Sequence, residues 1–171
     1  SPMSRGLGDV YKRQDLIASF ARAAENQNMS CLIVSSDKDL MQLVCSSISM
    51  LDPMKNKKIG VAEVIEKFGV GPNKVIDVQS LAGDSTDNVP GVPGIGIKTA
   101  AELINQFGDL DRLLAGAETI KQPKRRENLI KFAEQARISR QLVRLKDDVD
   151  LPFSIEQLQT PACDHDRLMA F

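Results

Sequence analysis

Five aspartates in this 171-residue sequence are candidates for a metal-ion site. Asp37 and Asp39 flank a lysine, Asp84 and Asp87 lie three positions apart, and Asp15 stands near the N-terminus. Carboxylate oxygens are preferred Mg²⁺ ligands, and two ions about 4 Å apart can activate a water and stabilise the leaving oxygen of a phosphodiester. Aspartates clustered without a metal would repel one another. We therefore take Asp37, Asp39, Asp84 and Asp87 as candidate catalytic residues.

Each acidic group also has a structural interpretation that the sequence leaves open. Asp37 or Asp39 could cap a helix that begins near Leu40, and Asp84 could turn the chain near Thr86. Taken singly, such capping is the commoner use of an aspartate. A calcium loop of the EF-hand kind is excluded, because the segments lack alternating ligands and a terminal Glu.

A segment rich in glycine and proline, residues 88–100, predicts a contact with phosphate. Gly91, Gly94 and Gly96 let the backbone approach a phosphate closely, and an apolar-faced helix follows them. Free N–H groups at the start of a helix bind anions, and Lys98 adds positive charge there. The pattern resembles a helix-hairpin-helix, a module that binds the DNA backbone without reading base sequence.

Hydrophobic periodicity indicates the elements that must position these residues. Residues 31–34 form an apolar run typical of a buried parallel strand, and residues 47–51 a second strand. Asp37 and Asp39 thus follow the carboxyl end of a strand, where open parallel sheets bind their ligands. Residues 55–58 are expected to form a basic loop. An α/β core with a helical extension follows from this order.

The predicted helices differ in length and in the face that they bury. They run from Asp15 to about Ala24, around residues 40–43, over residues 61–68, from Pro72 to about Ala82, from Ile97 to Phe107, from Leu110 to Leu114, and from Pro123 to about Leu142. The first is expected to bury Leu16, Ile17, Phe20 and Ala24 on one face.

Composition limits the function classes. With 42% hydrophobic and 26% charged residues, the chain is typical of a folded globular protein. No apolar run reaches the roughly 18 residues of a membrane span. Cys31, Cys45 and Cys163 are odd in number and lack CxxC spacing, which argues against structural zinc or disulfides and for reduced thiols in the cytoplasm. The net charge of −1 is not the basic balance of many nucleic-acid binders, so the placement of charge matters more.

The combined motifs resemble the 5′-nuclease family of DNA polymerase I and the flap endonucleases. Residues 84–96, Asp-Ser-Thr-Asp-Asn-Val-Pro-Gly-Val-Pro-Gly-Ile-Gly, carry the resemblance, Ser36-Asp-Lys-Asp39 resembles a metal motif, and Asp15-Leu-Ile-Ala18 resembles the end of an acidic motif. The continuation after Gln106 is more similar to the polymerase-linked version than to the stand-alone endonucleases.

The resemblance implies an α/β fold: the C-terminal part of a parallel-sheet, PIN-like nuclease core, followed by a helix-hairpin-helix region. It implies 5′→3′ exonuclease and flap endonuclease activity with two Mg²⁺ or Mn²⁺ ions, a K⁺ ion at the hairpin, DNA as substrate, and polymerase domains beyond the C-terminus. The metal ligands would be Asp15, Asp37, Asp39, Asp84 and Asp87. The DNA-binding residues would be Gly91, Gly94, Gly96, Lys98 and Thr99.

The departures from the family pattern concern the N-terminal part. Lys12 and Gln14 stand where the motif Glu-Ala-Asp-Asp before Leu-Ile-Ala has acids, and residues 1–14 resemble translated sequencing-adapter read-through. We expect residues 15–83 to be a partial nuclease core, 84–150 the helix-hairpin-helix region with C-terminal helices, and 151–171 a linker toward a proofreading-type domain. Such a fragment should be nearly inactive alone.

Two further function classes compete with the nuclease. A non-catalytic helix-hairpin-helix module would use residues 88–100 alone, but a pure binder gains nothing from four aspartates beside a polyanion. A structural or protein-interaction domain would leave the Pro-Gly segment without a role.

Overall fold

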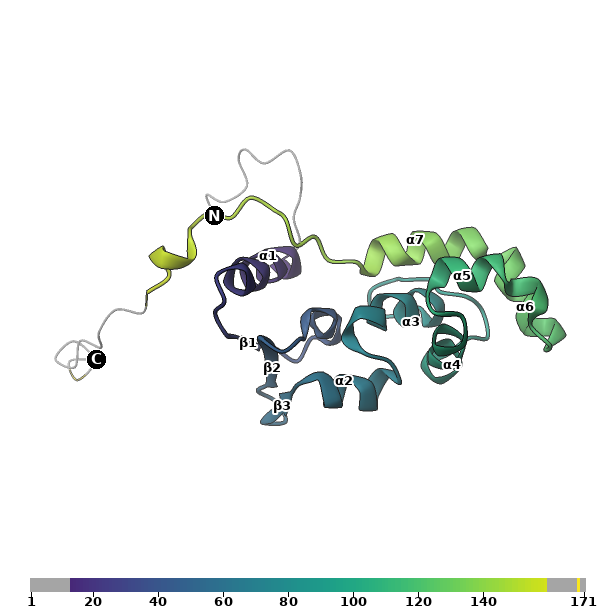
Figure 1. Ribbon diagram of the computed structural model, residues 1–171, viewed down its shortest axis with the longest axis horizontal. Coiled ribbons are helices and arrows are strands. Elements are labelled where there is room, and N and C mark those ends of the chain that lie inside the picture. Colours follow the sequence, from purple (N-terminus) through teal and green to yellow (C-terminus); the bar gives the residue numbers. More distant parts are fainter. Residues whose placement is uncertain (1–12, 160–168, 170–171) are drawn as a thin grey trace.

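The computed structural model describes residues 13–159 and residue 169 of the chain (Figure 1). Its helices are α1 (Arg13–Asn26), α2 (Val61–Phe68), α3 (Val75–Ala82), α4 (Ile97–Phe107), α5 (Leu110–Ala115), α6 (Pro123–Lys131) and α7 (Ala133–Val143), and its strands are β1 (Cys31–Val34), β2 (Ile48–Asp52) and β3 (Lys57–Ile59). A 3₁₀ helix, Lys38–Leu43, follows β1. Of the expected non-native segment, only Arg13 and Gln14 are described, and both belong to α1.

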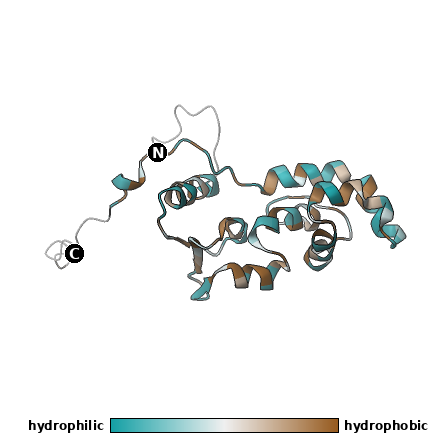
Figure 2. Cartoon of the chain, viewed as in Figure 1, coloured by the Kyte–Doolittle hydropathy of each residue, from teal (hydrophilic) through white to brown (hydrophobic). Residues whose placement is uncertain are grey.

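The sheet is mixed, with strand order β1-β2-β3. β1 and β2 are parallel, as predicted, whereas β3 runs antiparallel to β2 and occupies part of the predicted basic loop. The turn between β2 and β3 is hydrophilic (Figure 2), its Met54 N–H donates to Asp52 at 2.9 Å, and Asn56 is left-handed with φ 47°. The α/β class is therefore confirmed. The predicted parallel pairing is present between β1 and β2, and β3 makes the sheet mixed because the tight turn after β2 reverses the chain.

β1 buries one face only. Ile33 lies in the core with Ile48 and Met50 of β2, but Leu32 and Val34 are 53% and 60% exposed. The prediction of a buried parallel strand therefore holds for one face of β1 only. An apolar run alone does not tell how many faces of a strand will be covered.

Small side chains allow α1 to pack closely on the molecule. Its buried positions include Asp15, Ala18, Ser19 and Ala21, whereas Leu16 and Phe20 of the predicted apolar face are only half-buried. Ser19 Oγ accepts a hydrogen bond from the Val149 N–H at 3.1 Å, in the segment after α7. The close approach of that backbone explains why small and polar residues take the buried face.

α3 lies at the centre of the helical part and packs against α4 and α7 (Figure 1). The long helix predicted from Pro123 to Leu142 is instead two helices, because Phe132 (φ −107°, ψ 22°) ends α6 and begins the turn into α7. α4 has the predicted bounds. None of the described helices has the length and hydrophobicity of a membrane-spanning segment. The predicted domain boundaries stay predictions.

Candidate metal centre and phosphate-binding loop

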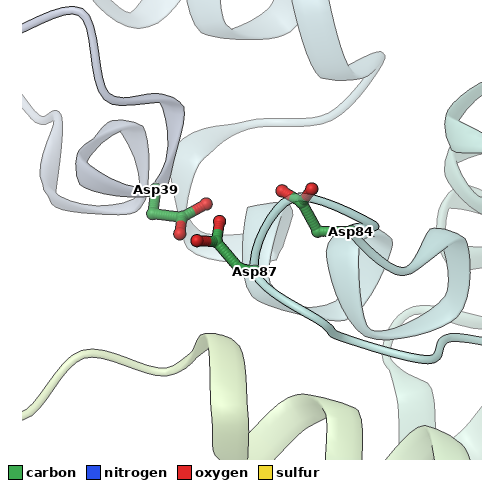
Figure 3. A group of neighbouring side chains, drawn as sticks. All are labelled: Asp39, Asp84 and Asp87. Carbon is green, nitrogen blue, oxygen red and sulfur yellow. The ribbon is translucent and has the colours of Figure 1, made fainter.

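Three of the five predicted aspartates meet at one point. Ligand atoms of Asp39, Asp84 and Asp87 all lie within 4.8 Å of one another (Figure 3). Asp39 comes from the 3₁₀ helix after β1, and the other two come from the loop between α3 and α4. Asp39 and Asp84 are each 8% exposed, while Asp87 is open to solvent. The group is thus buried on one side and accessible on the other.

A closed loop, rather than a helical turn, brings Asp84 and Asp87 together. The Asp84 N–H donates to Val89 O at 2.8 Å and the Val89 N–H to Asp84 O at 2.7 Å, so both ends of the loop are paired. Asn88 turns it with φ 55°, and the Thr86 N–H donates to Asp84 Oδ1 at 3.0 Å. The predicted chain-turning role of Asp84 is therefore real, and it is compatible with a place in the acidic group.

Asp37 and Asp15 lie outside the group of three. Asp37 caps the 3₁₀ helix, accepting from the Asp39 N–H at 3.0 Å, and its Oδ2 accepts from the Gln14 amide. Asp15 Oδ1 accepts a hydrogen bond from the Lys146 N–H at 3.0 Å and so ties α1 to the segment after α7. The capping role considered for Asp37 is present, and the ligand roles of Asp37 and Asp15 stay predictions.

The electrostatics of the group are uneven. Burial raises the pKa of Asp39, and the neighbouring Asp37, Asp87 and Asp84 raise it further, although Gln79 lowers it. Burial also raises the pKa of Asp84, but Lys38 and the Thr86 N–H outweigh it and hold that pKa below its usual value. The Lys38 ammonium forms an ion pair with Asp84 Oδ2 and its own pKa rises in consequence. The Lys38 ammonium thus supplies positive charge directly beside Asp84.

The candidate phosphate-binding loop, residues 88–96 before α4, depends on glycine at two positions. Gly91 has φ 60°, and a Cβ there would lie 2.5 Å from the Gly83 nitrogen; Gly94 has φ 79°. Gly96 precedes α4 with φ −93°, and no described side chain caps that helix. Because the first N–H groups of α4 have no cap, they are available to an anion. Gly94, Gly96 and Lys98 are exposed there, and Thr99 is half-buried.

Side chains of α6 and α7 fix the shape of this loop. Ser139 Oγ accepts from the Gly91 N–H at 3.0 Å, and Gln135 Nε2 donates to Gly91 O at 2.6 Å. Asn128 Nδ2 donates to Pro93 O at 2.8 Å. Sequence reasoning missed all three, since their partners lie more than thirty residues away. The available signal in the sequence was the presence of Asn128, Gln135 and Ser139 among mainly basic and apolar residues of these two helices.

Comparison with known proteins identifies the family. Residues 10–69 match the 5′-3′ exonuclease N-terminal, resolvase-like domain, and residues 70–166 match the 5′-3′ exonuclease C-terminal SAM fold. The chain belongs to the 5′-3′ exonuclease family. The resemblance inferred from the acidic and Pro-Gly motifs is thereby confirmed.

Relatives within this family differ in total length. The DNA polymerase I of Rhizobium leguminosarum is 51% identical over 161 residues, which cover 94% of this chain and 16% of that protein. The flap endonuclease Xni of Aeromonas hydrophila is 34% identical over 155 residues, covering 91% of this chain and 58% of that protein. The chain therefore spans a small part of the polymerase and a little over half of the stand-alone enzyme.

Solved structures share the fold of the 5′-3′ exonuclease chain. The T5 5′-exonuclease with divalent metal ions (zinc) bound has a TM-score of 0.74 at 22% identity and covers 80% of this chain and 51% of its own. A T5 flap endonuclease in complex with DNA and metal ions has a TM-score of 0.74 at 21% identity, over 80% of this chain and 50% of its own. At such identities the likeness concerns the fold.

Proposed function

We propose that this chain is the metal-binding and DNA-binding part of a 5′→3′ exonuclease and flap endonuclease domain of a bacterial DNA polymerase I. The enzyme hydrolyses DNA phosphodiesters in primer removal and repair, in the cytoplasm. The observation that carries the proposal is the convergence of Asp39, Asp84 and Asp87, next in sequence to the glycine- and proline-rich loop before α4, in a chain of the 5′-3′ exonuclease family.

The charge balance of the acidic group fits a divalent cation. Among residues 13–159, Lys38 is the one cation that forms an ion pair with any of the three carboxylates, so two formal negative charges stay unbalanced. We propose Mg²⁺ or Mn²⁺, because both accept carboxylate oxygens. Asp37, which is electrostatically coupled to Asp39, is our candidate ligand for the second ion of the expected pair. Divalent ions supply the Lewis acidity that phosphodiester hydrolysis needs.

The protein residues have separate tasks in this proposal. Asp39 and Asp84 hold the ions from the buried side, and the exposed Asp87 faces the side from which substrate enters. Gly94, Gly96 and the start of α4 bind backbone phosphates, and Lys98 adds charge, so contact is independent of base sequence. The K⁺ ion at this loop stays a prediction, which DNA affinity measured in KCl against LiCl would test.

A non-catalytic DNA-binding module is not favoured. It would explain the loop before α4 but neither the match of residues 10–69 to the nuclease N-terminal domain nor the three converging carboxylates. Without a metal, these carboxylates would repel the phosphates that the loop attracts.

The catalytic proposal is tested in the domain with its natural N-terminal half and acidic motif restored, on a 5′-flap substrate with Mg²⁺. Asp84→Asn or Asp39→Asn should lower cleavage by several orders of magnitude and leave DNA binding unchanged or tighter, because each removes a ligand and a negative charge. Asp109→Asn, at the cap of α5, is the matched control and should keep activity. Parallel loss of cleavage, binding and stability would show that the aspartates serve the fold alone.

The DNA-binding proposal is tested with the chain itself. It should bind duplex or flapped DNA weakly, without base preference, and lose affinity as salt concentration rises. It should also cleave very little, since Gln14 places an amide beside Asp37 where the family motif has an acid; Lys12 lies outside the described residues. Salt-independent binding would contradict a phosphate clamp.

A further inference from the structure

Gln79 of α3 is a buried polar residue that contacts the acidic group from behind. Its Nε2 donates a hydrogen bond of 2.7 Å to Asp39 Oδ1, and its side chain is only 3% exposed. The two residues are 40 positions apart, in different elements. Val75, one turn earlier on the same face of α3, is a fully buried apolar residue, so the amide stands beside an apolar side chain.

The other end of the same amide is unsatisfied. Gln79 Oε1 is buried and has no hydrogen-bond partner among the described residues. A buried unpaired acceptor costs about 1–3 kcal/mol, which an apolar side chain of the same size would avoid. Turning the amide over does not relieve this, because Oε1 would then face Asp39 Oδ1 in place of the donor Nε2. Packing alone therefore does not account for a glutamine at this position.

We propose that Gln79 is a positioning residue, which holds the Asp39 carboxylate turned toward Asp87 and thereby prepares the metal site (Figure 3). The inference rests on the proposed metal-dependent function. In the metal-free protein Asp39, Asp84 and Asp87 repel one another, so an unrestrained Asp39 would rotate away from the other two. The hydrogen bond from α3 opposes that rotation before an ion arrives.

Partners that orient a metal ligand commonly change metal affinity by about 10–100-fold when they are removed. Gln79→Met keeps the length and volume of the side chain but removes the donor. We expect it to weaken Mn²⁺ binding by about 10-fold or more, within that range. The change removes the unsatisfied Oε1 but also takes the donor from the buried Asp39 Oδ1, so we expect a folded chain whose melting temperature without metal changes little.

The test measures Mn²⁺ binding to this chain by electron paramagnetic resonance, without DNA. Ser80→Ala is the matched control: Ser80 is equally buried on α3, but its Oγ donates only to Ile76 O of its own helix, at 2.6 Å. This control should bind Mn²⁺ like the unchanged chain. Gln79→Leu is a second variant without the amide, in case the methionine disturbs the fold.

A second readout separates positioning from stability. In the restored domain, Gln79→Met should raise the Mn²⁺ concentration needed for half-maximal flap cleavage by a similar factor, with the maximal rate at saturating Mn²⁺ retained. Folded Gln79→Met and Gln79→Leu chains that bind Mn²⁺ as tightly as the unchanged chain would overturn the inference and leave the proposed function standing. Absence of Mn²⁺ binding by the unchanged chain would overturn the proposed metal site itself.

Discussion

At the residue scale, single side chains of the acidic group serve the fold and the site together. Asp84 turns its own loop through the Thr86 N–H and also faces Asp39 and Asp87. The capping interpretation and the ligand interpretation, which compete in the sequence, therefore do not exclude each other. Spacing identified the aspartates, but Gln79 could not be predicted, because its role arises only when α3 packs behind the 3₁₀ helix.

Lys38 yields the first prediction. Its ammonium is paired with Asp84, so an incoming cation must displace it. Lys38→Met should therefore tighten Mn²⁺ binding to the chain, measured by calorimetry, even though it removes a positive charge that phosphate would favour. Lys55→Met is the control, because Lys55 forms its ion pair with Asp52, at 4.0 Å, and with none of the three carboxylates of the acidic group. Weaker Mn²⁺ binding by Lys38→Met would show that Lys38 supports the site.

A second prediction follows from the raised pKa of Asp39. Its pKa is higher in the folded chain than its ordinary value of 3.8, chiefly through burial. The folded state therefore binds its proton more tightly, and stability falls as pH rises from 3.8 through the raised pKa. Asp39→Asn should make the metal-free chain more stable at neutral pH. Urea unfolding, compared between acidic and neutral pH, measures it.

Asp39 and Asp84 should change stability with pH in opposite directions. Asp84 has a lowered pKa, so its contribution to stability is present above its ordinary pKa and is lost as pH falls. Asp84→Asn should therefore destabilise the metal-free chain under the same conditions. If Asp39→Asn destabilised the chain as much as Asp84→Asn, the prediction that the Asp39 carboxylate lowers the stability of the metal-free chain would be wrong.

At the element scale, hydrophobic periodicity predicted the bounds of elements that local sequence determines. It failed where packing against another segment determines the bounds or the buried face. α4 has its predicted bounds, because its apolar face and the glycines before it are local signals. The break between α6 and α7 carries no Gly or Pro, and β3 is three residues long with mainly exposed lysines. On α1 the prediction was right for Ala24 and for Ile17, which packs against the core, but it missed the buried small residues against which the segment after α7 lies.

The loop before α4 gives the third prediction, a contrast between two glycines. Gly91→Ala should lower the free energy of unfolding by roughly 2–4 kcal/mol, because its φ is positive and the added Cβ overlaps the Gly83 backbone. Gly96→Ala should leave stability nearly unchanged, because its φ is −93° and no atom lies within 4 Å of a Cβ there.

Gly96→Ala, which should leave stability nearly unchanged, should instead affect DNA binding. Gly96→Ala places a methyl group at the start of α4, where phosphate would approach, and should weaken DNA binding while the chain stays folded. Chemical denaturation and fluorescence anisotropy with a DNA duplex measure the two effects. Normal DNA binding by Gly96→Ala would indicate that phosphate does not approach this helix start.

At the scale of the whole molecule, one face of the sheet carries exposed apolar side chains. Leu32 and Val34 are more than half exposed on β1, which pairs with β2 along one edge. Exposed apolar strands favour association between chains. The chain should therefore self-associate, and Leu32→Lys should shift it toward monomer in analytical ultracentrifugation. Met54→Lys, at an 83% exposed site in the β2–β3 turn, is the control. Equal association of all three chains would contradict this.

The acidic group between the 3₁₀ helix and the α3–α4 loop is the centre of the account, and anomalous diffraction from crystals soaked in Mn²⁺ tests it most directly. We predict a Mn²⁺ peak coordinated by Asp39, Asp84 and Asp87, with the Lys38 ammonium moved away from Asp84. Crystals without a peak at these carboxylates, and with Lys38 still paired to Asp84 at saturating Mn²⁺, would contradict the account.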